Sequence, residues 1–223
     1  SGGRVDRVAV WRAPDGKLYV RAVDYKTGAA EFDYAPVLQG GAVQLPLYLA
    51  ALTGMPEAEA LLGGKTEPAG FLYIPAGAAR KRHPGRPSPE ERESARRALK
   101  KRRGLLLDDP EVLRAMEDGG TPSFDYLPVR LKKDGTPFAG SPVLDAGQMD
   151  ALGRRVLDDL RRSALDLTRG DVSARPLVSA AGSPCDRCDY RQCCYHDETR
   201  DGINPMRKMN REQFLAELEA GVP

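Results

Sequence analysis

Residues 5–26 read VDRVAVWRAPDGKLYVRAVDYK, two apolar-rich segments separated by a polar turn. The alternation of apolar and polar residues predicts strands over Val5–Trp11 and Leu18–Lys26. Between them, Ala13-Pro14-Asp15-Gly16-Lys17 suits a type I turn closed by a glycine in the left-handed region. The stretch therefore predicts a short antiparallel hairpin that begins a sheet.

This hairpin gathers two carboxylates and an amine on one face. If it is symmetric about Asp15, Asp6 lies opposite Asp24 with β-carbons ~5 Å apart, and Lys26 shares that face because residues two apart on a strand point the same way. Clustered acids repel unless a cation or proton lies between them. Mg²⁺ favours oxygen ligands and helps a bound water to attack a phosphate. We therefore predict phosphodiester hydrolysis, with Asp6 and Asp24 holding Mg²⁺ and Lys26 assisting the nucleophile or stabilising the developing charge.

A solvated strand face is the alternative interpretation of any single Asp-x-Lys. The chain contains a second copy, Asp15-Gly16-Lys17, in which the aspartate and glycine serve the predicted turn. Only the copy at Asp24 has an aspartate opposite it, which favours the catalytic interpretation there.

An apolar helical pattern follows over Ala35–Thr53 and is expected to end at Gly54. Pro46 inside it predicts either a kink or a late helix start. Gln44 and Tyr48 are spaced i,i+4 and so share one helical face. Tyr48 is as easily a core aromatic as a site residue, whereas an amide buried at Gln44 needs hydrogen-bond partners.

Three segments together resemble the PD-(D/E)xK nucleases of the RecB-like branch. That branch shows G-x-I-D-R, then D-Y-K-[ST]-G, then Q-x-x-x-Y, and this chain has the same order in Gly3-Arg4-Val5-Asp6-Arg7-Val8, Val23-Asp24-Tyr25-Lys26-Thr27-Gly28 and Gln44-Leu45-Pro46-Leu47-Tyr48. The resemblance implies an α/β fold with a restriction-endonuclease-like core, a mixed sheet flanked by helices. It implies that Asp6 and Asp24 bind the catalytic Mg²⁺ and that Lys26 is catalytic. Gln44 and Tyr48 match the pair that supports the site and DNA contact.

Four cysteines lie within ten residues of one another: Cys185, Cys188, Cys193 and Cys194. This clustering favours a metal site in a reducing compartment over a disulfide framework. The frame is C-x2-C-x5-C, with Cys193 as an extra adjacent thiol. The pattern alone leaves zinc, an iron–sulfur cluster and free buried thiols open.

The segment Pro184–Asp197 resembles the C-terminal C-x2-C-D-Y-x3-C segment of the AddB family, subunits of bacterial AddAB helicase–nucleases. The resemblance implies a [4Fe–4S] clasp held by Cys185, Cys188, Cys194 and a fourth cysteine far upstream. Further AddB-like phrases cover nearly the whole chain: Ala69–Tyr73, Lys101–Leu107 and Leu131–Gly135. CRISPR-associated adaptation nucleases share the nuclease-plus-cluster layout, but the long middle segment favours the AddB family.

The resemblance implies a Mg²⁺-dependent DNA exonuclease domain that acts on single strands from unwound duplex ends during recombinational repair. It implies an AddA-like partner subunit and a cytoplasmic location. The motif G-x4-G-K-[ST] does not occur in the sequence, so we do not expect this chain to unwind DNA. Since the fourth cluster ligand and a helix that contributes to the metal site are implied upstream, we expect residues 1–223 alone to be weakly active or inactive. The alternative is a non-catalytic DNA-binding module stabilised by a metal cluster.

The composition and charge of the chain limit the functions that it can have. The 223 residues carry a net charge of +2, so a nucleic-acid surface must arise from local clustering. No apolar run reaches the ~18 residues of a membrane span, and no secretory leader is expected. Residues 80–103 hold eleven Lys or Arg against three Glu, a net charge of +8. That run either follows a DNA backbone or is a solvated helix and loop.

We expect a single nuclease domain over 1–223, preceded in the whole protein by a helicase-like part. Its catalytic motifs lie in 1–76, a basic insertion and hairpin in 77–145, and a long helix and cysteine clasp in 146–223.

The remaining predicted elements are two strands and four helices. The strands are a buried one over Gly70–Pro75 and one over Leu127–Lys132. The helices run from a Ser88/Glu91 cap towards Arg103, from Asp109 to about Glu117, over Ala146–Thr168 and over Arg211–Ala220. The helix over Ala146–Thr168 is amphipathic, with Leu152, Val156, Leu160 and Ala164 on one face.

Overall fold

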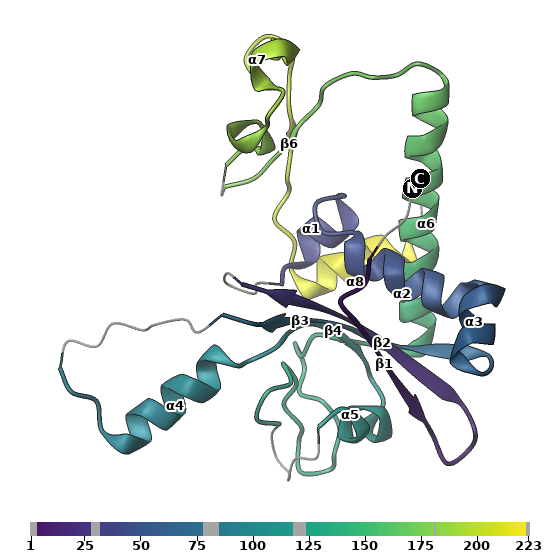
Figure 1. Ribbon diagram of the computed structural model, residues 1–223, viewed down its shortest axis with the longest axis vertical. Coiled ribbons are helices and arrows are strands. Elements are labelled where there is room, and N and C mark those ends of the chain that lie inside the picture. Colours follow the sequence, from purple (N-terminus) through teal and green to yellow (C-terminus); the bar gives the residue numbers. More distant parts are fainter. Residues whose placement is uncertain (1–3, 28–31, 78–84, 118–123, 181, 222–223) are drawn as a thin grey trace. The chain divides into compact units, whose positions relative to one another are not determined.

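The computed structural model describes residues 4–27, 32–77, 85–117, 124–180 and 182–221 (Figure 1). The chain divides into two compact units. The first unit comprises residues 1–32 and 44–154, and the second comprises residues 33–43 and 155–223. Each unit is described below by itself.

A five-stranded mixed sheet forms the centre of the first unit. Its strands lie in the order β1 (Arg7–Arg12), β2 (Leu18–Lys26), β3 (Thr66–Pro75), β4 (Arg103–Leu107) and β5 (Val143–Leu144). The β1/β2 and β3/β4 pairs are antiparallel, whereas β2/β3 and β4/β5 are parallel. The predicted mixed sheet is therefore confirmed, and the first hairpin supplies its edge strand.

The β1–β2 hairpin has the predicted symmetric register. Its cross-strand partners run from Arg7 opposite Val23 to Arg12 opposite Leu18. In the turn, the Ala13 N–H donates to the Lys17 carbonyl at 2.9 Å, and the Gly16 N–H donates to the Ala13 carbonyl at 2.9 Å. Gly16 has φ +90, as the glycine position of the predicted turn requires.

The helical pattern after the hairpin is two helices rather than one. α1 (Tyr34–Leu38) stops before Gly40, which has φ +87, and α2 runs over Gln44–Gly54. Pro46 lies in the first turn of α2, where its missing N–H removes no helical hydrogen bond. The prediction of one continuous helix is thus wrong, but its late start and its end at Gly54 are confirmed. α3 (Pro56–Leu62) follows directly and was not predicted.

Helices cover the two faces of this sheet. α2 packs against β2 and β3, and α5 (Pro110–Met116) lies on the opposite face (Figure 1). α5 starts where predicted, directly after Asp109, whose carboxylate caps the helix by accepting from two backbone N–H groups. The core on the α5 side is wholly apolar and consists of Leu72, Leu106, Leu113, Phe124, Leu127, Val129, Leu131 and Val143.

The close approach of β3 to β4 depends on glycine. Gly70 has φ +122, and a Cβ there would overlap the Leu105 carbonyl oxygen. The sequence prediction found β3 but missed β4, because an unbroken apolar run over Gly104–Leu107 has no period to identify it. The predicted strand over Leu127–Lys132 is confirmed only at its end, which pairs across the turn at Asp134-Gly135. Leu131 bridges Pro137, the Lys132 N–H donates to the Thr136 carbonyl at 2.7 Å, and the Phe138 N–H donates to the Arg130 carbonyl at 2.8 Å.

α4 (Pro89–Leu99) starts with the predicted capping box between Ser88 and Glu91. It has no buried residue. Its acidic side chains lie in its first half and its arginines lie mostly in its last turn, followed by Lys100 and Lys101. Since α4 itself holds three Glu and three Arg, the net positive charge of residues 80–103 comes from the residues before and after the helix rather than from the helix.

In the second unit, α1 packs against α8 (Arg211–Glu219), with the Tyr34 and Phe214 rings 5.0 Å apart between centroids. The Gln39 side chain both donates to and accepts from the backbone of Arg207, each at 2.8 Å. The helix α8 matches the prediction over Arg211–Ala220 to within one residue.

α6 runs over Ala146–Thr168, as predicted, and spans the boundary between the units. Only two of the four side chains predicted to form its apolar face are buried. Leu152 and Val156 are buried, but Leu160 is 51% exposed and Ala164 is also exposed.

The remaining elements of the second unit are short: β6 (Leu177–Val178), a 3-10 turn η1 (Pro184–Arg187), α7 (Arg191–Cys194) and β7 (Asn204–Pro205). β6 and β7 pair in parallel. Among the described residues, no helix has the length and apolar character needed to cross a membrane.

Candidate functional site

The two predicted carboxylates lie at the same end of the first hairpin. The register pairs Arg7 with Val23, so Asp6 and Asp24 are the next pair along, one step beyond the last paired residues. Asp6 is exposed, and its Oδ2 accepts a hydrogen bond from the Tyr25 N–H at 2.9 Å. This bond ties Asp6 to β2, although Asp6 itself precedes the first residue of β1.

Asp24 is the enclosed member of the pair. Its side chain is 15% exposed, against 44% for Lys26. The Lys26 ammonium forms an ion pair with Asp24 Oδ2 at 2.6 Å. Among the described residues, that oxygen accepts no hydrogen bond of acceptable geometry. Asp24 therefore keeps a buried acceptor whose one close neighbour is a flexible cation.

Tyr73 joins this group through the parallel pairing of β2 with β3, which places it opposite Asp24. The Lys26 ammonium lies 5.4 Å from the centroid of the Tyr73 ring. Burial, and to a lesser degree the Asp24 carboxylate, raise the pKa of Tyr73. The sequence predicted a buried strand here but not its partner strand, so Tyr73 was missed. The signal that could have found it is the alternation within Phe71–Leu72–Tyr73, once β3 is set beside β2.

Gln44 and Tyr48 lie one turn apart on α2, as predicted. The Gln44 side-chain amide donates to the Tyr48 hydroxyl at 3.3 Å. Gln44 is exposed, so the expectation of a buried amide is wrong, whereas Tyr48 is half-buried. In the described part of the chain, no hydrogen bond or ion pair joins this pair to Asp6, Asp24 or Lys26.

The carboxylate end suits a hard divalent cation. Mg²⁺ is usually bound by one or two carboxylates, with waters and substrate phosphates completing its shell. Asp24 Oδ2 is buried and has no hydrogen-bond donor in the part of the chain that the structure describes, and the β1–β2 register continues to Asp6 opposite Asp24. Within the described ranges, no group of three or more His, Cys, Asp or Glu side chains could hold a metal. The two aspartates thus fit a cation that takes its other ligands from water and substrate.

The four cysteines are all free thiols. Cys185 is half-buried, and Cys188, Cys193 and Cys194 are exposed. Cys185 lies in η1, which starts with a Ser183/Asp186 capping box, and Cys193 and Cys194 end α7. As they stand, the described thiols do not form a metal site. The sequence reasoning did not single out His196, whose enclosed Nε2 has no hydrogen-bond partner among the described residues.

Comparison with known proteins agrees with the geometry of the first unit. Residues 2–195 match the model of the PD-(D/E)XK nuclease superfamily. The chain is also similar to proteins named as a subunit of an ATP-dependent helicase/deoxyribonuclease. It is 40% identical to the one from Moorella thermoacetica over 209 residues, 32% identical to that of Symbiobacterium thermophilum over 210, and 34% identical to that of Desulforudis audaxviator over 225.

These matches cover 93%, 93% and 98% of this chain, respectively. The chain spans 18% of the length of each of the three relatives. The family match covers most of the chain, including the first hairpin, the mixed sheet and the cysteine segment. On these grounds, the chain belongs to the PD-(D/E)XK nuclease superfamily.

Proposed function

We propose that this chain is a Mg²⁺-dependent deoxyribonuclease domain that hydrolyses phosphodiester bonds at the carboxylate end of the β1–β2 hairpin. The observation that carries the proposal is Asp24 Oδ2, a buried acceptor without a hydrogen-bond donor among the described residues, which lies 2.6 Å from the Lys26 ammonium and one register step beyond the last β1–β2 pair, opposite Asp6. A buried carboxylate oxygen without a hydrogen bond of good geometry is costly, so a divalent cation would stabilise it in addition to the Lys26 ammonium.

Each side chain has a distinct role in the proposal. Asp6 and Asp24 would hold the metal, which when bound lowers the pKa of a water and neutralises charge on the phosphate being cut. Lys26 neutralises Asp24 in the metal-free state. Its side chain is flexible and 44% exposed, so the ammonium can turn from Asp24 towards a phosphoryl oxygen and stabilise the charge that develops there. The Tyr73 ring holds that ammonium near the site through a cation–π contact. Gln44 and Tyr48 shape the α2 side of the site.

The test of this function is cleavage of labelled single-stranded and duplex DNA with Mg²⁺, with EDTA, and with EDTA followed by excess Mg²⁺. We expect cleavage that EDTA abolishes and added Mg²⁺ restores. Cleavage that is indifferent to EDTA would contradict the proposal. So would an absence of cleavage from the whole subunit with Mg²⁺ present, and that result would favour a non-catalytic DNA-binding module.

The names of the relatives support a role for this chain within a larger protein. They are named as helicase/deoxyribonuclease subunits, and this chain matches 18% of their length. We propose that it is the nuclease part of such a subunit, that it works with an AddA-like partner, and that it degrades single strands from unwound ends during recombinational repair.

We further propose that Cys185, Cys188 and Cys194 bind a [4Fe–4S] cluster together with a ligand from outside residues 1–223. The support is the frame C-x2-C-x5-C and the free state of all three thiols. The thiols would have to converge, and the bonds that hold η1 and α7 are local ones that permit this. Iron, sulfide and zinc analysis of protein purified without air tests the proposal. About four irons per chain in the full subunit, lost in Cys188→Ser, is the expected result; zinc without iron would refute it.

A further inference from the structure

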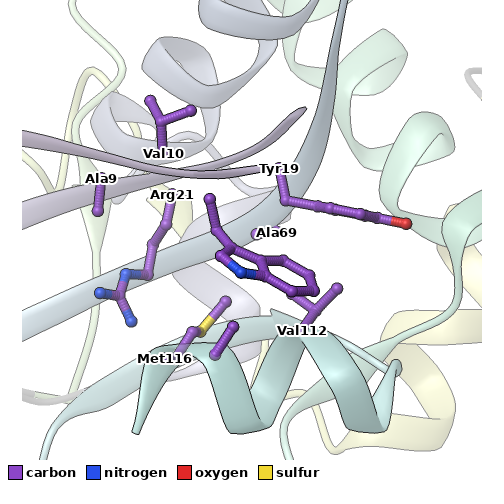
Figure 2. Close-up of a pocket in the computed structure, with 9 residues that line it drawn as sticks. Ala9, Val10, Tyr19, Arg21, Ala69, Val112 and Met116 are labelled. Carbon is purple, nitrogen blue, oxygen red and sulfur yellow. The ribbon is translucent and has the colours of Figure 1, made fainter. Parts of the chain in front are cut away.

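A small cavity lies between the sheet and α5 in the first unit. Its volume is about 70 Å³, and its walls are mainly apolar, with Trp11, Tyr19, Val112 and Met116 among them (Figure 2). The Trp11 and Tyr19 rings stack with centroids 5.7 Å apart. One charged side chain, Arg21 of β2, also lines the cavity.

The Arg21 side chain is half-buried, and two of its donor atoms have no partner among the described residues. Figure 2 shows its side chain extending from β2 towards the helix that carries Met116. Its Nε and Nη1 atoms are closed off from water and have no hydrogen-bond partner among the described residues. Because a buried guanidinium donor without an acceptor is costly, these two atoms call for an anion that the described residues do not supply.

Two more guanidiniums lie close enough to act on Arg21. Burial is the main cause that lowers the pKa of Arg21, to about 10, and the positive charges of Arg102 and Arg7 lower it further. Arg21 therefore still carries its charge at neutral pH. In the described part of the chain, none of these three arginines forms an ion pair. The three form a positive group, the arginine cluster, that has no ion-paired carboxylate within the described ranges.

The cluster lies at the carboxylate end of the sheet but on its other face. Arg7 directly follows Asp6, and Arg21 is three residues before Asp24 on β2. Arg103 pairs with Tyr73, which pairs with Asp24, so Arg102 lies at the same end. Since neighbouring residues on a strand point to opposite faces, Arg7 and Arg21 point away from the face that holds Asp24 and Lys26.

Aromatic side chains accompany these arginines. The Arg102 guanidinium lies 5.7 Å from the centroid of the Tyr126 ring. Arg7 Nη1 donates a long hydrogen bond, 3.4 Å, to the Tyr25 hydroxyl, and Tyr25 is 40% exposed. Guanidiniums interleaved with exposed aromatic rings are typical of surfaces that bind single-stranded nucleic acid.

We propose that the arginine cluster of Arg7, Arg21 and Arg102 binds backbone phosphates of a single DNA strand on the α5 side of the sheet, next to the candidate cleavage site. This inference rests on the proposed function, because that function supplies the DNA. A single carboxylate of another polypeptide would neutralise one guanidinium and leave two. Successive phosphates of one strand offer an oxyanion to each of the three.

The test measures binding without cleavage. A fluorescein-labelled oligo(dT) strand is titrated with the chain in EDTA over a range of KCl concentrations, and fluorescence anisotropy gives the affinity. We expect Arg21→Met and Arg7→Gln each to weaken binding several-fold and to reduce the salt slope by about 0.7, the value for one phosphate contact on a single strand. The matched control is Arg12→Gln, at the far end of β1, which should change neither quantity.

A second measurement separates a binding role from a structural one. Without DNA, Arg21→Met should raise the midpoint of thermal unfolding, because it replaces an unpartnered charge in an apolar cavity with an apolar side chain. Adding oligo(dT) should then raise the midpoint of the wild type more than that of the variant.

Three results are distinguishable. Wild type that fails to bind oligo(dT) would count against the proposed function as well as against this inference. Wild type that binds, with Arg21→Met and Arg7→Gln binding equally well at the same salt slope, would overturn the inference alone. A lowered unfolding midpoint in Arg21→Met with unchanged binding would show that Arg21 stabilises the fold rather than binding DNA and would also overturn it.

Discussion

The chain contains two Asp-x-Lys sequences, and their surroundings give them different chemistry. Asp15 and Lys17 lie 3.4 Å apart in the hairpin turn, and both side chains are more than half exposed. The Lys17 backbone N–H donates to Asp15 and lowers the pKa of that carboxyl. Asp24 is 15% exposed and has no such donor among the described residues. Asp15 therefore closes a turn, whereas we propose that Asp24 binds a divalent cation.

This difference predicts where a divalent ion binds. Mn²⁺, followed by the electron paramagnetic resonance of the free ion, should bind the wild-type chain and Asp15→Asn equally. Asp24→Asn should bind at least about tenfold more weakly, since changes even to residues that support metal ligands cost 10–100-fold. Equal binding by Asp24→Asn and Asp15→Asn would place the ion elsewhere.

A second prediction at the scale of residues is that the Tyr73 ring positions the Lys26 ammonium. Tyr73→Leu removes the aromatic face beneath the ammonium and should lower kcat/KM about fivefold, or ~1 kcal/mol. Tyr73→Phe keeps the ring and should restore the rate. Burial and Asp24 raise the pKa of Tyr73, so the phenol stays protonated at the pH of the assay. The pH profile of Tyr73→Phe should therefore match that of wild type. A changed profile would mean that the hydroxyl itself takes part.

At the scale of elements, β3 is the strand on which the first unit depends. Leu72 is fully buried in the α5-side core, whereas Leu61 on α3 is 85% exposed. Leu72→Ala should lower the free energy of unfolding by about 2–5 kcal/mol, and Leu61→Ala should change it by less than ~0.5 kcal/mol. Urea denaturation followed by circular dichroism compares the two. A mild effect at Leu72 would show that this core is loosely packed.

The elements that the sequence predicted well are those with local signals. The hairpin has a turn at Asp15-Gly16, α4 has its Ser88/Glu91 box, and α5 has its Asp109 cap, so each start is marked by a few adjacent residues. β4 has no such signal, because its apolar run is equally consistent with a buried helix segment. The strand predicted over 127–132 is reduced to a short pairing with residues 136–138, because the alternation of buried and exposed residues does not show how long the partner segment is.

At the scale of the whole molecule, sequence alone could place only part of the site. Asp6, Asp24 and Lys26 follow from one hairpin and its register, so they could be predicted from the sequence. Tyr73 reaches Asp24 through a parallel pairing that spans many residues, and Arg21 is enclosed by α5, far along the chain. No short stretch of sequence indicates either the pairing of Tyr73 with Asp24 or the packing of α5 over Arg21. The arrangement of the cysteines likewise could not be predicted from their spacing.

The most direct test of the proposed function is Mg²⁺-dependent cleavage of single-stranded DNA by Asp24→Ala beside Asp15→Ala, measured in the full subunit that we propose contains this chain. We predict that Asp24→Ala loses activity about 10³-fold, or ~4 kcal/mol of barrier, and still binds DNA. Asp15→Ala should cleave within a few-fold of wild type. Cleavage by Asp24→Ala within a few-fold of wild type would contradict the assignment of the site.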